Sequence, residues 1–132
     1  MIVADLTIWS AALRGQTRGF ESLFNDLLLK SELTAPGAVF AQLLQEADQP
    51  GFAHRLRTWA VQVPWVEETR GSWIAVGDLG AHLAGQGNHV QLADACVLTL
   101  CLREEWPLWT MNPRVDAVAR SLPIKRYQPQ GL

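Results

Sequence analysis

The fold is decided by the first stretch of the chain, Met1-Ile2-Val3-Ala4-Asp5-Leu6-Thr7-Ile8-Trp9. An apolar run ends at the carboxylate of Asp5 and a helix-like pattern follows, which indicates a buried strand leading into a helix. Asp5 would then stand at the carboxyl end of the strand. Ligands bind at that edge of open parallel sheets, because strand ends and helix N-termini meet there. Any chemistry at Asp5 would therefore depend on side chains that later strands bring to the same edge.

The composition is typical of one globular domain spanning residues 1–132. Apolar residues make up 48% of the chain and charged residues 18%, which excludes a disordered chain. A domain of this length buries ~65–70% of the surface of its unfolded chain, so it needs no disulfide or metal in order to fold.

The charge of the chain limits its partners. A formal net charge of −2 and a pI near 5.9 exclude a strongly basic protein that binds nucleic acid without specificity. Nine of the eleven basic residues are arginines, so a local groove lined by arginine remains open. Any contact with RNA must then be confined to one face.

Cysteine and histidine give no sign of a metal or disulfide framework. Cys96 and Cys101 are five residues apart, about 140° of helical rotation, so we expect two buried thiols in a reducing compartment. The histidines show no spacing of metal ligands. The chain has no apolar run of the ~18–20 residues that span a membrane, and its N-terminus lacks a basic region before an apolar one. We expect no membrane contact and a cytoplasmic location.

Helical and extended patterns alternate along the chain, which predicts a three-layer α/β/α fold with a mainly parallel sheet flanked by helices. The expected strands are Ile2–Asp5, Leu33–Ala35, Pro107–Thr110 and a closing Ile124–Tyr127, and Val63–Val66 is either a short strand or an extended link. The expected helices are Thr7–Arg14, Thr17–Lys30, Pro36–Ala47, Phe52–Val61, Ser72–Ala84, Ala93–Glu105 and Val115–Ser121. The helix Ala93–Glu105 is apolar on most sides, so we expect it in the middle of the fold.

Four blocks of the sequence resemble those of a known family. They are Asp5-Leu6-Thr7-Ile8-Trp9, Val39-Phe40-Ala41-Gln42-Leu43-Leu44, Leu92-Ala93-Asp94-Ala95 and Leu108-Trp109-Thr110-Met111-Asn112. In this order and at these spacings they resemble the signature blocks of PIN domains. The closest subgroup is the VapC-like toxins of bacterial and archaeal toxin–antitoxin pairs, and the resemblance covers nearly the whole chain.

This resemblance implies a divalent-metal-dependent endoribonuclease that acts on RNA, with Mg²⁺ or Mn²⁺ held by three or four acidic side chains. Mg²⁺ prefers oxygen ligands and keeps several waters, so the chemistry needs carboxylates that converge from distant segments. Asp5 and Asp94 match two of the acidic positions and are the expected metal ligands. The resemblance also implies a cognate antitoxin protein and a homodimer, both using the helices after the second strand.

The other two acidic positions hold amides. Gln42 stands where the family has a glutamate on a helix, and Asn112 stands where it often has an aspartate. An amide keeps an oxygen that can contact a metal or its water, but it carries no negative charge. We therefore expect Gln42 and Asn112 to assist catalysis only through that oxygen, and we expect the metal affinity to be low. Glu46 and Asp116, one helical turn beyond Gln42 and Asn112, could compensate.

The residues of the expected site also have simpler interpretations. Asp5 could be only a helix cap, and Asp94 could be favoured by the dipole of the helix that it begins. The hydroxyls of Thr7 and Thr110 could orient water or a ligand, or they could cap helices. A residue that caps a helix could also take part in the site.

Arginine and tryptophan supply the remaining candidates for RNA binding. Arg14, Arg18 and Arg114 could bind phosphates at the edge of the site, or they could be ordinary surface charges. An exposed tryptophan could stack on unpaired bases or line a protein-binding groove, whereas most of the six are expected in the core. They are Trp9, Trp59, Trp65, Trp73, Trp106 and Trp109.

Two functional hypotheses follow. The first is an RNA-cleaving enzyme of VapC type, and the second is a PIN-like domain that has lost efficient catalysis and serves as a binding or dimerisation module. A phosphorylatable receiver domain would need an acidic pair after the first strand, a central strand-end aspartate and a late strand-end lysine. Here Asp5 is single, the middle of the chain offers no such strand, and the only late lysine is Lys125. The sequence also contains no phosphate-binding GxxxxGK[ST] loop, GxGxxG turn or GxSxG nucleophile elbow.

Overall fold

Three short parallel strands form the centre of the molecule. The computed structural model describes residues 1–15 and 19–129, and its sheet has the order β2-β1-β3, with β1 at Ile2–Ala4, β2 at Leu33–Thr34 and β3 at Leu108–Trp109. Both pairs of neighbours are parallel, and Val3 on the central strand lies opposite Thr34 on one side and Leu108 on the other. The carboxyl ends of all three strands therefore meet at one edge of the sheet.

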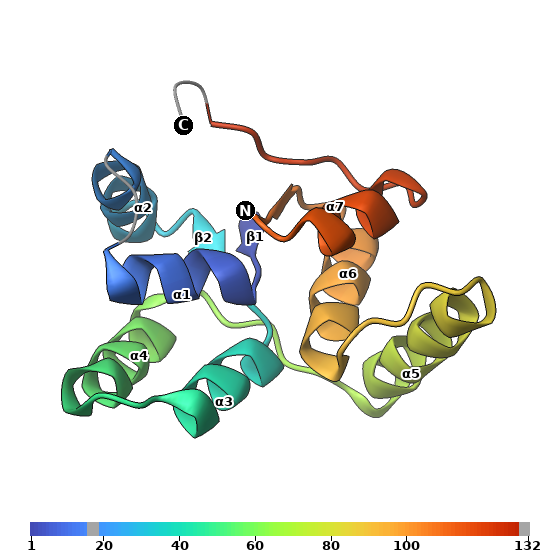
Figure 1. The fold of residues 1–132 in the computed structure, drawn as a ribbon, viewed down its shortest axis with the longest axis horizontal. Coiled ribbons are helices and arrows are strands. Elements are labelled where there is room, and N and C mark those ends of the chain that lie inside the picture. The colour runs from blue at the N-terminus through green and yellow to red at the C-terminus, as the bar shows by residue number, and fades with distance from the viewer. Residues whose placement is uncertain (16–18, 130–132) are drawn as a thin grey trace.

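Helices cover the sheet on both sides. Figure 1 shows α1 to α4 on one side of the strands and α5 to α7 on the other. The described helices are α1 Leu6–Arg14, α2 Phe20–Leu29, α3 Gly37–Glu46, α4 Pro50–Gln62, α5 Arg70–Gly85, α6 Leu92–Glu104 and α7 Pro113–Arg120. This arrangement confirms the three-layer α/β/α fold expected from the sequence. Within the described residues, no helix is long and apolar enough to cross a membrane.

The boundary between β1 and α1 is set by local chemistry. Asp5 is the N-cap of α1, and its side chain accepts hydrogen bonds from the backbone N–H groups of Thr7 and Ile8. The helix ends at Gly15, whose φ of 63° is a left-handed conformation that glycine adopts without strain. The interpretation of Asp5 as a helix cap is therefore confirmed.

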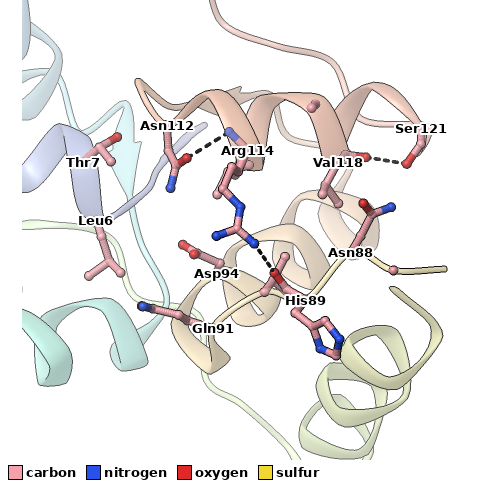
Figure 2. Close-up of a pocket in the computed structure, with 14 residues that line it drawn as sticks. Leu6, Thr7, Asn88, His89, Gln91, Asp94, Asn112, Arg114, Val118 and Ser121 are labelled. Carbon is pink, nitrogen blue, oxygen red and sulfur yellow. Dashed lines mark hydrogen bonds between the residues drawn. The ribbon is translucent and has the colours of Figure 1, made fainter. Parts of the chain in front are cut away.

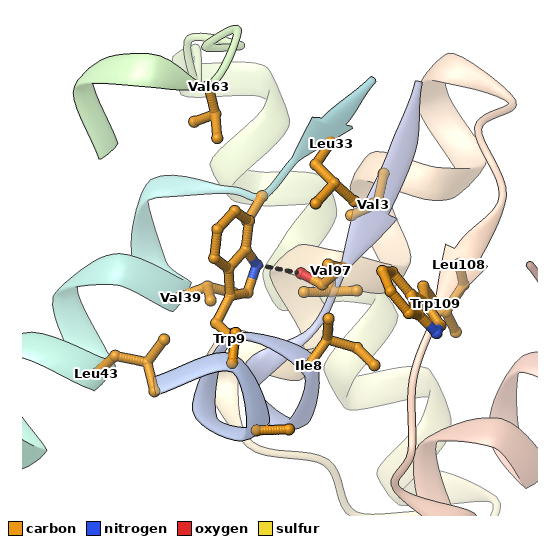
Figure 3. Packing of buried hydrophobic residues seen from close by; sticks show 14 of the residues in the cluster. Val3, Ile8, Trp9, Leu33, Val39, Leu43, Val63, Val97, Leu108 and Trp109 are labelled. Carbon is orange, nitrogen blue, oxygen red and sulfur yellow. Dashed lines mark hydrogen bonds between the residues drawn. The ribbon is translucent and has the colours of Figure 1, made fainter. Parts of the chain in front are cut away.

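The core is built around an aromatic cluster at Trp9. Its ring is fully buried and lies 5.2 Å from the ring of Phe24, 5.0 Å from Phe40 and 5.6 Å from Trp59, measured between centroids. The indole Nε1 donates a hydrogen bond of 3.0 Å to the carbonyl of Ala4 at the end of β1 (Figure 3). A buried indole N–H needs such a partner, so this bond fixes the packing of α1 on the sheet.

The central position expected for α6 is confirmed. All residues from Ala93 to Cys101 are buried, and the helix contacts β1, β3, α3 and α5. The two thiols on this helix are free and buried, as expected from their spacing. Burial raises the pKa of Cys96 to about 11 and that of Cys101 to about 12, so both remain neutral at physiological pH.

The prediction of a closing strand at Ile124–Tyr127 is wrong. This segment forms one isolated parallel bridge, between Leu108 and Arg126. The Leu108 N–H donates to the carbonyl of Lys125 and the Leu108 carbonyl accepts from the Tyr127 N–H. β3 is only two residues long, and the segment pairs with it through this single bridge, which is too short to count as a strand.

Two other expected elements differ in detail. Val63–Val66 forms no strand and is an extended link, because Pro64 has no N–H to donate; its carbonyl instead accepts a hydrogen bond from the Thr34 hydroxyl. The helix expected at Thr17–Lys30 begins at Phe20, after a left-handed Gly19. Residues 16–18, which include Arg18, lie outside the described part of the chain.

Candidate functional site

Asp5 is a fully buried carboxylate that joins β1, α1 and the segment after β3. Its Oδ1 accepts hydrogen bonds from the backbone N–H of Thr7 at 2.9 Å, from that of Ile8 at 3.3 Å, and from the Thr7 hydroxyl. Its Oδ2 accepts a hydrogen bond from the Thr110 hydroxyl. Burial raises the pKa of Asp5, and the hydrogen bonds from Thr110 and Thr7 oppose that rise. The carboxylate is thus held in one orientation at the sheet edge.

The two threonine hydroxyls also hold the backbone after β3. The Thr7 hydroxyl accepts a hydrogen bond of 2.9 Å from the Met111 N–H, and the Thr110 hydroxyl accepts one of 3.0 Å from the Asn112 N–H. Asn112 in turn caps α7, because its Oδ1 accepts a hydrogen bond of 3.0 Å from the Arg114 N–H. Asn112 and Arg114 therefore have fixed positions relative to Asp5.

Asp94 lies in the first turn of α6 and is 8% exposed. The pKa of this carboxyl is raised to about 6, chiefly by burial and also by the negative charge of Asp5, while the positive charge of Arg114 opposes the rise. The charge of Asp5 acts on Asp94, so the two carboxylates interact electrostatically although they belong to segments far apart in the sequence. A carboxyl with a pKa near 6 can hold or release a proton close to neutral pH.

A cavity of about 460 Å³ opens beside Asp94, between the loop before α6 and the length of α7 (Figure 2). This volume lies in the range of natural small-molecule sites. Asp5 lies next to the cavity rather than in its wall, and Thr7, which is bonded to Asp5, does line it. The polar side chains in the wall belong to Thr7, Asn88, His89, Gln91, Asp94, Asn112, Arg114 and Ser121.

Arg114 brings a positive charge into this cavity. Its guanidinium Nη2 donates a hydrogen bond of 3.3 Å to the carbonyl of His89, on the opposite wall. Figure 2 shows the guanidinium between His89, Asp94 and the side chain of Asn112. The cavity thus combines one carboxylate with one arginine.

Gln42 and Glu46 lie outside this cavity. Both are on α3, and the Gln42 side-chain amide donates a hydrogen bond to the Glu46 carboxylate. Glu46 lines a second hollow, of about 510 Å³, which it shares with Thr7 and Met111. Thr7 lines both hollows, so the two adjoin at the start of α1.

Two other expected residues lie away from the cavity. Asp116 pairs with Arg126 at 2.9 Å and with Arg120 at 3.1 Å, and the hydrogen bond from Arg126 lowers its pKa. Arg14, at the end of α1, lies 3.8 Å from a carboxylate oxygen of Asp48 and is 40% exposed. Of the residues expected in the site, the structure brings together Asp5, Asp94, Asn112, Arg114 and the two threonines.

The side chains around Asp94 supply few ligands for a hard cation. Among the residues that the structure describes, no three His, Cys, Asp or Glu side chains form a metal-binding group. Mg²⁺ needs only one or two carboxylates if it keeps most of its waters; Asp94 supplies one in the cavity wall, and Asp5 lies buried next to it with both oxygens accepting hydrogen bonds. Both carboxyls have raised pKa values, so a cation near them would relieve an unfavourable negative charge. The residues therefore fit one cation that is mostly hydrated.

The loop from Gly87 to Gln91 forms one wall of the cavity, although it carries no motif of a functional site. This loop comes directly before the helix that carries Asp94, so it must reach the same edge of the sheet. The polar residues Gln86, Asn88 and His89 beside two glycines are typical of a turn, so the composition alone does not mark a site. The position of a polar loop before a helix with an acidic first turn is the signal that could have identified it.

The fold is that of a three-layer α/β/α domain of PIN-like architecture. A chain of VapBC2 from Rickettsia felis, solved in complex with a DNA fragment from its promoter, aligns with a TM-score of 0.70 and 13% identity over 96% of this chain and 98% of that chain. A chain of FitAcB from Neisseria gonorrhoeae aligns with a TM-score of 0.65 and 14% identity over the full length of both. No protein-family model matches the sequence, and no curated protein is similar to it. At this level of identity the likeness establishes the fold.

Proposed function

We propose that this protein is the toxin component of a toxin–antitoxin pair and acts as a weak divalent-metal-dependent endoribonuclease. The observation that carries the proposal is the interacting pair Asp5 and Asp94 beside a polar cavity at the carboxyl edge of the parallel sheet. Carboxylates that converge at this edge from distant segments are the arrangement that a metal-dependent hydrolase requires. The four sequence blocks and the PIN-like fold support the same assignment.

Each residue of the cavity has a role in this proposal. Asp94 and Asp5 would hold Mg²⁺ or Mn²⁺, and Thr7 and Thr110 keep Asp5 in position through their hydroxyls. When bound there, the metal supplies charge neutralisation and an activated water for attack on a phosphodiester. Arg114 binds a phosphate of the RNA, and the Asn112 amide orients ligand or water beside Asp94. Two carboxylates instead of four make the metal affinity and the activity low.

The proposed antitoxin partner binds on the face formed by Trp65 and Trp73. These side chains are 45% and 47% exposed and line a hollow of about 370 Å³ with the first turn of α3. Large exposed aromatic side chains around a hollow are typical of protein interfaces. The neighbour from Rickettsia felis is a two-component complex, which agrees with this role. We also propose a homodimer, because the resemblance to VapC-like toxins implies one.

Cleavage of a fluorescent single-stranded RNA in Mn²⁺ and in EDTA tests the nuclease proposal. The parent should cleave in Mn²⁺ and not in EDTA, and Asp94→Asn should abolish cleavage. Asp78→Asn, at an exposed position on α5, is the matched control and should cleave like the parent. Cleavage that survives EDTA, or an Asp94→Asn protein as active as its control, would show that the proposal is wrong.

A second candidate function is a PIN-like binding module without catalysis. The observation in its favour is that Gln42 lies outside the cavity and that its amide bonds to Glu46. In that case the parent would show no metal-dependent cleavage but would still bind its antitoxin. The cleavage assay therefore separates the two candidates directly.

A further inference from the structure

Arg114 gives the cavity a resident positive charge that depends on no metal. Its Nη2 is bonded to the His89 carbonyl at 3.3 Å, and this bond uses one of the five N–H groups of the guanidinium. The anchoring restricts the side chain before any ligand arrives, so less conformational entropy is lost when an anion binds. A guanidinium fixed in this way can present its other N–H groups to phosphate oxygens in pairs.

The rest of the wall is suited to the polar edges of a base. Three side-chain amides, those of Asn88, Gln91 and Asn112, line the cavity from two sides of Arg114. The amides of Asn88 and Gln91 offer both donors and acceptors, and Asn112, whose Oδ1 caps α7, offers the donors of its NH₂ group, which together match the mixed pattern on a nucleobase. Leu6 and Val118 add apolar wall, and the volume of about 460 Å³ is large enough for a whole nucleotide rather than for a phosphate alone.

We propose that this cavity binds a nucleoside monophosphate unit without a metal ion, with Arg114 on its phosphate and the amides of Asn88, Gln91 and Asn112 on its base and sugar. The inference rests on the proposed function, because it assigns the same cavity to nucleic acid. It goes further in separating phosphate binding by Arg114 from metal binding by Asp94. Asp94 lines the same cavity, and its negative charge repels a phosphate but attracts a metal ion. The charge of Asp94 therefore affects the two kinds of ligand in opposite directions.

Calorimetric titration in EDTA at low ionic strength tests this inference. The probes are AMP, GMP, CMP and UMP, with inorganic phosphate and the four nucleosides as partial ligands. At least one monophosphate should bind about tenfold more tightly than phosphate or its own nucleoside, because both halves of the ligand contribute. If every monophosphate binds no more tightly than phosphate, the cavity holds only an adventitious anion and the inference is wrong.

Substitutions at Arg114 test whether this side chain binds the phosphate. Arg114→Met should weaken binding of the monophosphate by about tenfold or more. Arg114→Lys should weaken it less, because lysine keeps the positive charge but lacks the planar guanidinium group. Arg120→Met is the matched control, since Arg120 is an exposed arginine on the same helix that pairs with Asp116 and lies outside the cavity. Equal affinity for Arg114→Met and Arg120→Met would contradict the inference.

Asp94→Asn separates this inference from the proposed function. The substitution removes the repelling charge, so monophosphate binding in EDTA should become tighter while RNA cleavage in Mn²⁺ disappears. If the parent binds monophosphates but never cleaves RNA, the nuclease proposal fails alone. If the parent cleaves RNA in Mn²⁺ and shows no metal-free binding, this inference fails alone.

Discussion

The Thr110 hydroxyl donates a hydrogen bond to the Asp5 carboxylate, which joins the end of β3 to the end of β1 across most of the length of the chain. Asp5 is fully buried, so each donor that reaches it reduces the cost of burying its charge. The same threonine hydroxyl accepts from the Asn112 N–H and so orders the residues that lead into α7. This contact holds the site together and also contributes to the stability of the fold.

We expect Thr110→Val to lower the free energy of unfolding by about 1–2 kcal/mol, because it removes a donor to a buried carboxylate and preserves the shape of the side chain. Thr110→Ser keeps the hydroxyl and should cost less. Urea unfolding of both variants measures the difference. A loss for Thr110→Ser as large as that for Thr110→Val would contradict the expectation, because the methyl group would then contribute as much as the hydrogen bond.

The stability of the protein should depend on Asp94 between about pH 4 and pH 6. Its pKa is about 6 in the folded protein, against an ordinary value of 3.8, so in this range the folded state binds the proton more tightly than the unfolded chain does. Stability from this group is therefore lost as the pH rises through the window. Asp94→Asn removes the effect, and its advantage over the parent should grow from near zero at pH 4 to about 2–3 kcal/mol at pH 7. Urea unfolding at four pH values checks this, and an advantage that is the same at every pH would contradict it.

Replacing Trp9 should lower the free energy of unfolding more than replacing any other tryptophan. Trp9→Phe removes the hydrogen bond from Nε1 to the Ala4 carbonyl and leaves space among Phe24, Phe40 and Trp59. We expect a loss of about 2–4 kcal/mol in unfolding free energy. Trp73→Phe, at a half-exposed position on α5, is the control and should change stability by less than ~0.5 kcal/mol. Comparable losses for the two variants would argue against the central role of Trp9.

The two amides at the expected ligand positions should respond differently to acidic replacement. Asn112→Asp keeps the helix cap and adds a carboxylate beside Asp94, so Mn²⁺ should raise the melting temperature of this variant more than that of the parent. Gln42→Glu removes the donor to Glu46 and places two like charges side by side, so it should lower the melting temperature without metal. Gln45→Glu, at an exposed position on the same helix, is the control for added charge. If Mn²⁺ acts on Asn112→Asp as it does on the parent, Asn112 does not face the cation.

Much of the fold was predictable because its signals are local. The apolar run before Asp5 and the helical pattern after it mark the end of β1, and the apolar sides of the helix at Ala93–Glu105 mark it as central. The approach of Thr110 to Asp5 follows from a general rule, since the ends of parallel strands meet at one edge. Such features need no knowledge of tertiary contacts.

Other features depend on packing that no sequence pattern specifies. The segment at Ile124–Tyr127 has the composition of a strand, yet β3 is too short to pair with more than one of its residues. The bond between Gln42 and Glu46 matches a helical spacing of four, but its position outside the cavity depends on how α3 packs against α1. The orientation of Arg114 is likewise set by a distant partner, the carbonyl of His89.

The central claim is that the cavity beside Asp94 is the nucleic-acid site of this protein. Titration of ¹⁵N-labelled protein with a short single-stranded RNA, followed by the backbone amide signals, tests it most directly. We expect the largest shifts at Thr7, Gln91, Asp94, Asn112 and Arg114, all of which line the cavity. Shifts confined to Trp65, Trp73 and their neighbours, or no shifts at saturating RNA, would contradict the claim.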